Sequence, residues 1–399
     1  MNIFVFGNTN NYPLRLAQAL QELGHDTTLV VDRREPLHRP ESLVPEYANG
    51  YPDWIIDFSH LSEEDYVGPS PRITQVVSLL EGADALILNS LGPSLLSFVE
   101  KPAISFLTGS DLSYYANFDT IGNRAANYDP AFRRSAAARL DARLWAGFIQ
   151  RQREGILRST AVSYFHRGMV PKDDALLDGI GVSDEQRMFI YMCRELSYEP
   201  RHTNKNERPV LFCGTRLTWK KPIPPGASPL DYKGSDVMIH GVALFREKTG
   251  MDFDMRIFEK GLHVQEARAL AHELGLDDCI TWLPEMPAHD FYRELESADI
   301  CFEQLGESCI GMVGLDAMAM GKPVIANAHP EIWRRHLGCE WPICHATTPE
   351  EVCSHLESLV PNPRMRSKIG KESSTFVQKH FSPRANARQC LERLKRGPS

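Results

Sequence analysis

The sequence predicts an α/β protein built from two Rossmann-like, doubly wound domains that face a cleft. Short apolar runs alternate with helical segments along most of the chain, which is typical of parallel sheets covered by helices. The chain has 399 residues, more than one hydrophobic core usually serves. A polar, proline-bearing stretch from Leu196 to Pro209 interrupts the alternation, and we expect it to link the two domains.

The first half opens with a strand, a helix and a second strand. Residues 2–8, NIFVFGN, are an apolar run ending in a Gly-Asn turn, and LRLAQALQELGHD follows with apolar residues near helical spacing. Gly24 then ends the helix before the strand TTLVVD. Further strands are predicted at 53–58, 85–90, 103–109 and 161–166. This half defines a first domain at residues 1–196.

The alternation restarts after Pro209 and defines a second domain at residues 208–381. Strands are predicted at VLFCGT, FDMRIF, CITWLP, DICFEQ and PVIANA, with helices at GSDVMIHGVALFREKTG, VQEARALAHELG, AHDFYRELESA and MVGLDAMAMG. Ligands bind outside the carboxyl ends of the strands in such sheets. Polar residues that follow these strands are therefore the candidates for a functional site.

Composition argues against several classes of protein. A net charge of -8 disfavours a nucleic-acid binder with a wholly basic surface. No run of about 18 apolar residues predicts a spanning helix, and the first residues lack the features of a secretion signal. All nine cysteines lie from Cys193 onward without a CxxC pair, which favours free thiols and the cytoplasm.

Three segments of the second half resemble the retaining, nucleotide-sugar-dependent glycosyltransferases of the GT-B fold, the large family numbered four. GTRLTWKK…DYKGSDVMIHGVALF resembles the family's Gly-Arg-Leu…Lys-Gly segment, and CITWLPEMPAHDFYRELESADICFEQ its strand, loop, helix and Ala-Asp strand. SCIGMVGLDAMAMGKPVIA resembles its Glu-x7-Glu motif. The first half is similar more loosely, through ALQELGHDTTLVV and KPAISFLTGSDL. The resemblance implies transfer of a sugar with retained configuration, and a C-terminal helix, 382–399, that packs back on the first domain.

The run GLDAMAMGKPVIA places one carboxylate, Asp316, early in a helix of small residues. If the helix begins near Gly311 or Met312, its first amides form a ready site for a diphosphate. A carboxylate accepts hydrogen bonds from two vicinal hydroxyls, so Asp316 suits a ribose. The alternative is a first-turn residue favoured only by the helix dipole.

The resemblance assigns the remaining donor contacts. It implies that the amides of Ile310 and Gly311 hold the donor sugar together with Glu307 or Ser308. Ser308 stands at the motif's first Glu and Asp316 at its second. Leu283 ends a strand where a nucleobase could pair with backbone groups, although core packing explains it equally well.

Departure of the diphosphate needs positive charge, which the resemblance assigns to Arg216 and Lys233. A guanidinium grips two phosphate oxygens and an ammonium supplies a point charge, so no metal or other cofactor is expected. Sixteen residues separate the two, including Lys220 and Lys221, and which lysine reaches the phosphate is left open. A solvated basic loop is the alternative.

In the first domain, FLTGSDL stands where the family often has a His-Gly-x-Asp segment. Thr108 replaces the His. Gly109 follows it directly, and Asp111 stands three positions after Thr108. A threonine hydroxyl donates one hydrogen bond but does not shuttle protons near neutral pH. In GNTNN, the loop after the first strand, Asn8 either lines the acceptor cleft or belongs to a plain turn.

Residues 132–158 are the most basic segment, with seven arginines against two acids. Helical spacing places Leu140, Leu144, Phe148 and Ile149 on one face. The segment contacts an anionic membrane surface or an anionic acceptor, or it is a core helix with a solvated basic face.

Taken together, these features predict a cytoplasmic, metal-independent hexosyltransferase, with peripheral membrane contact through 132–158 as one option. Its partners are a nucleotide sugar and an acceptor that is a glycan, a lipid-linked sugar or a small molecule, with no nucleic acid. Two alternatives stay open. A pseudo-glycosyltransferase would keep the nucleotide site but catalyse another coupling, and a scaffold subunit would explain Thr108, Ser308 and the missing glycine-rich loop.

Overall fold

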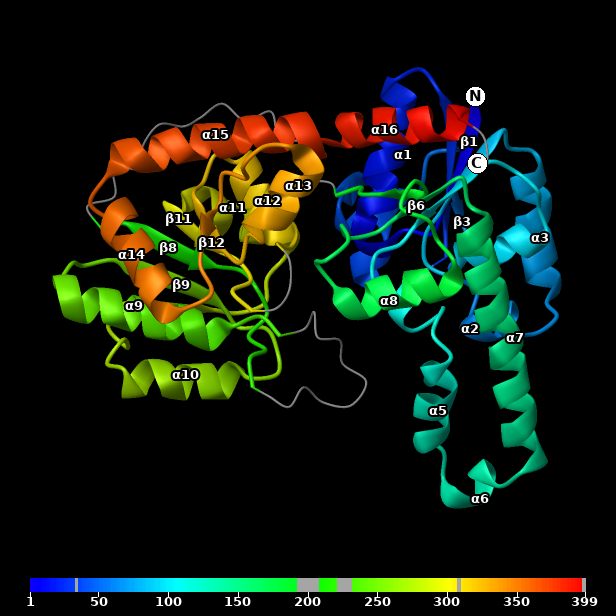
Figure 1. Ribbon diagram of the computed structural model, residues 1–399, viewed down its shortest axis with the longest axis horizontal. Helices are drawn as coiled ribbons and strands as arrows, with labels where there is room; N and C mark the ends of the chain where they lie inside the picture. Colours follow the sequence, from blue (N-terminus) through cyan, green and yellow to red (C-terminus); the bar gives the residue numbers. More distant parts are fainter. Residues whose placement is uncertain (33–34, 192–207, 221–231, 307–309, 397–399) are drawn as a thin grey trace. The chain divides into compact units, whose positions relative to one another are not determined.

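The computed structural model describes residues 1–32, 35–191, 208–220, 232–306 and 310–396 (Figure 1). The chain divides into two compact units, Met1–Tyr191 with Pro383–Ser399, and Met192–Ser382. Each unit is a parallel sheet with helices around it, which confirms the predicted α/β class with two Rossmann-like domains. The predicted linker lies outside the described residues, apart from Arg208 and Pro209.

The first unit contains a seven-stranded parallel sheet in the order β3-β2-β1-β4-β5-β6-β7. Its strands are β1 (Asn2–Phe6), β2 (Asp26–Val31), β3 (Ile55–Asp57), β4 (Ala85–Leu88), β5 (Ala103–Phe106), β6 (Ala161–Ser163) and β7 (Arg187–Met188). All six predicted strands form, and β7 is an addition. The strand order reverses between β1 and β4, so the carboxyl ends of these two strands border a crevice.

Helices and short 3-10 turns surround this sheet. The helices are α1 (Tyr12–Glu22), α2 (Glu63–Val67), α3 (Pro71–Glu81), α4 (Ser110–Ser113), α5 (Asp119–Ala126), α6 (Pro130–Arg133), α7 (Ala136–Arg158), α8 (Pro171–Ile180) and α16 (Pro383–Lys395). The turns are η1 (Thr9–Asn11), η2 (Pro36–His38), η3 (Pro40–Ser42), η4 (Pro45–Asn49) and η5 (Gly92–Ser97). In α16, Asn386 Nδ2 donates to the carbonyl of Tyr191 at 3.0 Å, which ties this C-terminal helix to the first unit.

The segment predicted as one helix over 132–158 is two helices. The first ends at Arg133 with Arg134 as its C-cap, and Ser135 caps the second, because its Oγ accepts the amide of Ala138 at 3.0 Å. The expected burial of this whole face in the core is also wrong. Phe148 and Ile149 are buried in the core, whereas Leu140 is 58% exposed and Leu144 36%. Figure 1 shows why, since α5, α6 and the first half of α7 project away from the sheet of the first unit.

The second unit contains a six-stranded parallel sheet in the order β10-β9-β8-β11-β12-β13. Its strands are β8 (Val210–Cys213), β9 (Asp254–Phe258), β10 (Ile280–Leu283), β11 (Ile300–Phe302), β12 (Val324–Ala326) and β13 (Cys344–His345). Its helices are α9 (Ser235–Thr249), α10 (Val264–Glu273), α11 (Ala288–Ser297), α12 (Met312–Ala319), α13 (Pro330–Leu337), α14 (Pro349–Leu359) and α15 (Pro363–Phe381). The five predicted strands form, and the order reverses between β8 and β11.

Helix α12 is fixed from one side by α15. A Cβ on Gly370 of α15 would lie 1.9 Å from the carbonyl oxygen of Gly321, so the two backbones approach as closely as only glycine allows. Ser374 Oγ donates to the carbonyl of Ala319 at 3.1 Å. The end of α12 is therefore held in place, which also fixes where its first turn points.

Candidate active site

The reversal of strand order in the second unit brings the predicted donor residues to one edge of the sheet. Gly214 and Arg216 follow β8, and Glu303 and Gln304 follow β11, directly beside it. Helix α12 begins at Met312 with Gly311 as its N-cap, as the sequence predicts. Switch points of this kind are where open α/β sheets bind ligands.

Lys233 is buried, and its Nζ donates to Gln304 Oε1 at 2.9 Å. Its backbone amide donates to the carbonyl of Thr218 at 2.7 Å, and its carbonyl accepts the amide of Leu305 at 2.9 Å. Arg216 lies two residues before Thr218 and is exposed. The chain thus returns after sixteen intervening residues, so that the backbone of Lys233 contacts Thr218, two residues after Arg216.

Lys220, the rival for this role, turns away from that edge. Its Nζ lies 3.3 Å from Glu266 Oε1 on α10. Lys221 lies outside the described residues. Among the lysines of this loop that the structure describes, Lys233 is the one directed at the end of β11.

Two glycines bring the Lys233 segment against the β11 loop. Gly234 has φ +67°, and a Cβ there would lie 2.6 Å from the amide nitrogen of Gly306. A Cβ on Gly306 would in turn lie 2.4 Å from the carbonyl oxygen of Tyr232. Any larger residue would push the Lys233 segment away from Gln304.

Glu303 is a site residue that the sequence analysis missed. Its side chain is buried, and Oε2 accepts the amides of Gln304 and Gly311, each at 2.8 Å. Burial raises the pKa of Glu303, while the two amides and the charge of Lys233 act in the opposite direction. The Gly311 amide, predicted to hold the donor sugar, is therefore already bonded to a protein carboxylate.

The first turn of α12 is shaped to admit this carboxylate. A Cβ on Gly311 would lie 2.7 Å from Glu303 Oε1, and a Cβ on Gly314 would lie 2.7 Å from Glu303 Cγ. The one signal for Glu303 in the sequence is an acid placed directly after the short apolar run ICF, at the end of a central strand.

Asp316 is only 1% exposed, and its Oδ2 accepts the hydroxyl of Tyr292 on α11 at 2.7 Å. A ribose could reach this carboxylate only if Tyr292 moved. Leu283 is half-buried, and its carbonyl accepts the amide of Glu259 at 2.8 Å within the sheet.

The remaining predicted donor residues lie within the segment 307–309 or directly after it. Glu307 and Ser308 lie outside the described residues. Ile310 is buried, whereas Met312 is partly exposed at the start of α12.

In the first unit, Asn8 lies at the strand reversal but is fully buried. Its Oδ1 accepts the amide of Leu14 at 3.0 Å, and its Nδ2 donates to Asn11 Oδ1 at 2.7 Å and to the carbonyl of His38 at 2.8 Å. All of its hydrogen-bonding groups thus serve the start of α1 and the adjacent loop.

Asp111 is a buried carboxylate that organises the turn after β5. It accepts the amides of Thr108 and Gly109 at 2.8 and 2.7 Å, and the Thr108 hydroxyl at 3.1 Å. The sequence analysis also missed Asn89, which joins this turn to η1, the turn after β1. The Oδ1 of Asn89 accepts the amide of Thr9 at 3.0 Å, and its Nδ2 donates to the carbonyl of Phe106 at 2.7 Å. Thr108 and Gly109 stay half-buried and are the members of the predicted acceptor set that a ligand could touch.

Among the residues that the structure describes, no group of three or more His, Cys, Asp or Glu residues is placed to hold a metal ion.

The fold is that of the GT-B glycosyltransferases. HepE from Anabaena, solved in complex with UDP and glucose, superposes with a TM-score of 0.60 at 14% identity, covering 99% of each chain. Sucrose-phosphate synthase from Thermosynechococcus elongatus superposes with a TM-score of 0.59 at 13% identity, covering 99% of this chain and 98% of that one. At such identities the likeness shows the fold alone.

Residues 228–375 match the family described as glycosyl transferases group 1, so this part of the chain is similar to the glycosyltransferase domains of that group. The D-inositol 3-phosphate glycosyltransferase of Pseudarthrobacter chlorophenolicus is 27% identical over 158 residues, which are 37% of this chain. The chain spans 36% of the length of that relative. The resemblance found in the sequence is thereby confirmed at the level of GT-B glycosyltransferases.

Proposed function

We propose that this protein is a glycosyltransferase that moves a sugar from a nucleoside diphosphate to an acceptor, with retention of configuration. The observation that carries the proposal is Lys233. Its ammonium is buried at the strand reversal beside the start of α12, inside the segment that matches the group 1 family. A buried cation beside a helix N-terminus is the arrangement that a leaving diphosphate requires.

In this proposal Lys233 and Arg216 neutralise the leaving group. Lys233 is fixed by Gln304 and supplies a point charge, whereas exposed Arg216 closes on two phosphate oxygens. Two protein cations make a metal unnecessary for this step.

The donor sugar is assigned to Glu307 or Ser308 and the amide of Ile310, since the Gly311 amide is held by Glu303. Asp316 binds the ribose after Tyr292 gives way.

The first unit binds the acceptor through Thr108 and Gly109, with Asn8 and Asp111 holding their loops. Thr108 already donates its hydroxyl proton to Asp111, and it is no proton shuttle. The acceptor's proton therefore passes to the departing phosphate. The rate arises from positioning and from charge stabilisation at the phosphate.

Three further parts of the proposal, namely the nucleotide, the compartment and the membrane contact, are supported by relatives or by composition. The HepE structure supports UDP as the first nucleotide to test. The absence of paired cysteines in the sequence supports work in the cytoplasm. No helix among the described residues is long and apolar enough to cross a bilayer, and peripheral membrane contact through 132–158 is the proposed alternative.

Donor turnover tests this function. The protein is incubated with UDP-, GDP-, ADP- and dTDP-sugars, and the first product is followed by NMR. We expect consumption of one donor and a first product with the donor's anomeric configuration. Arg216→Ala should lower the rate at saturating donor, while Lys220→Ala, on the same loop, serves as the control. An inverted first product would overturn retention.

The alternatives give different results in the same assay. A pseudo-glycosyltransferase would consume a donor but form a product without a glycosidic bond. A scaffold subunit would consume none of the four donors.

A further inference from the structure

The projecting part of the first unit, residues 118–145, is a preformed arm. It comprises α5, α6 and the first half of α7 (Figure 1). The Arg124 guanidinium stacks on the Trp145 ring at 3.9 Å, and the Tyr128 hydroxyl donates to Asp141. These two contacts join α5 and the turn after it to α7. The arm therefore projects as an ordered element.

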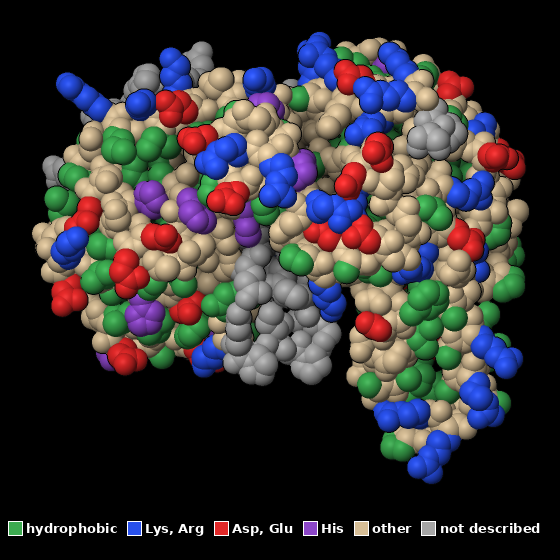
Figure 2. Space-filling model, viewed as in Figure 1, with side chains coloured by type: hydrophobic (Ala, Val, Ile, Leu, Met, Phe, Trp, Pro, Cys, Tyr) green, Lys and Arg blue, Asp and Glu red, His purple; other side chains and the backbone are tan. Residues whose placement is uncertain are grey.

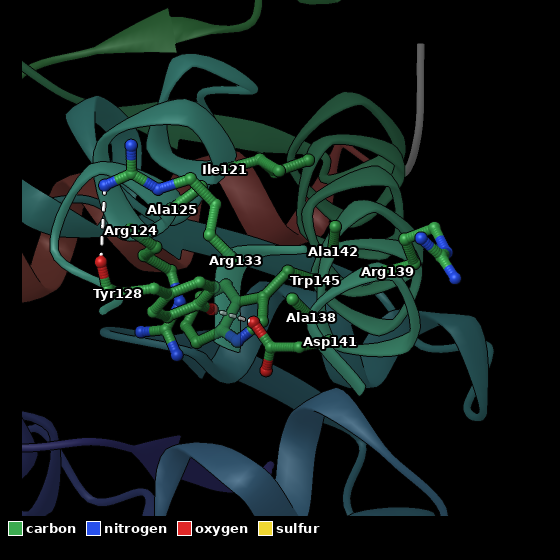
Figure 3. Close-up of a pocket in the computed structure, with 10 residues that line it drawn as sticks. All are labelled: Ile121, Arg124, Ala125, Tyr128, Arg133, Ala138, Arg139, Asp141, Ala142 and Trp145. Carbon is green, nitrogen blue, oxygen red and sulfur yellow. Dashed lines mark hydrogen bonds between the residues drawn. The ribbon is translucent and has the colours of Figure 1, made fainter. Parts of the chain in front are cut away.

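A cavity of about 180 Å³ lies within the arm (Figure 3). Apolar side chains of Ile121, Ala138 and Trp145 line it together with the guanidinium groups of Arg124 and Arg133. Arg133 donates to the carbonyls of Ala126 and Tyr128 at 2.8 and 3.3 Å, which orients its charge at the rim. Asp141 also lines the cavity, so the charge around it is mixed.

Four exposed arginines, Arg133, Arg134, Arg139 and Arg143, gather over α6 and the start of α7. Within the described part of the chain, none of the four forms an ion pair with a carboxylate. By contrast, Arg39, Arg167 and Arg187 of the same unit are each paired with aspartates. The positive charge of these four arginines is thus available to a ligand or surface outside the arm. Figure 2 shows Lys and Arg side chains grouped at the end of this projection.

Two of the three acids of the arm form hydrogen bonds within it, and the third, Asp119, is exposed at the start of α5. Asp129 caps α6 by accepting the amides of Ala131 and Phe132 at 2.9 and 3.0 Å. Asp141 accepts the Tyr128 hydroxyl. Neither carboxylate neutralises the four arginines.

Large apolar side chains are exposed among these arginines. Phe132 is 39% exposed, and Leu140 and Leu144, one turn apart on α7, are exposed as noted above. Interleaved arginines and apolar side chains suit the boundary between lipid headgroups and acyl chains.

We propose that the arm docks on an anionic phospholipid surface. Phe132, Leu140 and Leu144 enter the interface while the four arginines bind lipid phosphates. This assigns residues and lipid chemistry to the peripheral contact suggested above, and it does not depend on sugar transfer.

Vesicle sedimentation with the full-length protein tests the proposal. The probes are vesicles of phosphatidylglycerol mixed with phosphatidylcholine, and vesicles of phosphatidylcholine alone. We expect binding to the first kind only, and weaker binding as salt is raised. The triple variant Arg134→Ser, Arg139→Ser and Arg143→Ser should lose about fivefold in affinity for each arginine.

Matched controls distinguish the contribution of the arm to vesicle binding from the contribution of the protein's total charge. Arg364→Ser, Lys368→Ser and Lys371→Ser remove the same charge from exposed positions on α15 and should leave binding within about twofold of the original. Leu140→Ser with Leu144→Ser should weaken binding at high salt as well, whereas Leu262→Ser, at a 62% exposed leucine, should not. Because all of these side chains are exposed, thermal melting should be unchanged.

Three results would overturn the proposal. The first is no binding of the unaltered protein to the phosphatidylglycerol vesicles. The second is equal weakening by the arm and α15 charge variants. The third is arm-dependent binding of an anionic glycan without binding to vesicles, which would assign the arm to an acceptor instead. Nucleotide titration of the same samples shows whether the donor site is intact, so failure of the arm and failure of the transferase are distinguishable.

Discussion

At the scale of single residues, Asp316 is a proposed ligand contact with a side chain that is only 1% exposed. Its carboxylate is held by Tyr292 at 2.7 Å inside the second unit. If Asp316 binds a ribose, the Tyr292 hydroxyl competes with the ligand. Tyr292→Phe should then strengthen nucleotide binding several-fold, by about the 1 kcal/mol of one hydrogen bond. Asp316→Ala should weaken it.

Calorimetric titration of both variants decides between a ligand role and a packing role. If Asp316 only anchors α11 to α12, both substitutions lower the melting temperature and neither changes affinity. That outcome would remove Asp316 from the site.

Glu303 predicts a pH dependence of stability. Its pKa is raised in the folded protein, so the folded state holds the proton more tightly than the unfolded state does. The protonated Glu303 therefore stabilises the folded protein at pH values below the usual pKa range of Glu. This stabilisation is lost as the pH rises through the raised pKa of Glu303. Glu303→Gln removes the titrating group, so stability no longer falls with pH at this position. The variant keeps both hydrogen bonds from the backbone amides, because a single side-chain oxygen accepts both of them.

We therefore expect the melting temperature of Glu303→Gln, relative to the unaltered protein, to rise between about pH 4 and pH 7. Glu303→Ala, which loses the amide bonds, should melt lower at both values. A constant difference between Glu303→Gln and the unaltered protein would show that Glu303 does not titrate in this range.

The sequence could predict residues of the proposed diphosphate site but not the hydrogen bonds that they make with the rest of the protein. Arg216 and Lys233 stand in recognisable segments, and the structure brings their backbones together through Thr218. Glu303 was missed because its partner, the Gly311 amide, is eight residues away across the β11 to α12 loop. Such a contact depends on tertiary structure and produces no periodic pattern in the sequence.

At the scale of elements, the packing of α7 against η5 depends on one glycine. A Cβ on Gly155 would lie 1.8 Å from the carbonyl oxygen of Pro93, which is backbone and cannot rotate away. Gly155→Ala should therefore destabilise the first unit by about 3 kcal/mol. Thermal unfolding measures the loss.

Gly147→Ala is the control on the same helix. The nearest atom to its added Cβ would be 3.7 Å away, an ordinary contact, and alanine favours the helix by about 1 kcal/mol. Equal melting temperatures for the two variants would contradict the close approach of α7 and η5.

Strands were the most predictable elements because apolar runs between turn signals are local features. The two that were missed, β7 and β13, are only two residues long and are completed by pairing with β6 and β12. The helix predicted over 132–158 was too long because arginines and alanines continue the helical pattern through Ser135. The side chain of Ser135 nevertheless starts a new helix.

At the scale of the whole molecule, the C-terminal helix completes a unit that the N-terminus begins. Ala387, Cys390, Leu391 and Leu394 of α16 are buried. Arg393 donates to the carbonyls of Glu185 and Arg187 at 2.7 and 3.1 Å. Ending the chain after Ser382 should destabilise the first unit by several kcal/mol, at about 1.5 to 3 kcal/mol for each buried leucine.

Limited proteolysis measures this effect, with cleavage within residues 1–191 as the readout. A chain ending after Arg396 keeps all of α16 and is the matched control. Equal resistance of the two truncated chains would show that α16 does not support the first unit.

The fold class could be predicted because two independent alternating patterns both define parallel sheets. The role of α16 came from the family resemblance, since nothing in residues 383–395 indicates which sheet they cover. The exposure of the arm could not be predicted either. Leu140 and Leu144 share the helical period of the core residues Phe148 and Ile149 but lie beyond the end of the core.

The central claim is that the start of α12, with Lys233, binds a nucleoside diphosphate. Its most direct test is calorimetric titration of the protein with UDP, GDP, ADP and dTDP, without metal. We expect micromolar binding of one of them. Lys233→Ala should weaken it by about 2 kcal/mol, roughly thirtyfold, and Lys220→Ala should leave it unchanged. Failure of all four to bind a folded sample, or equal affinity in both lysine variants, would contradict the assignment of this site.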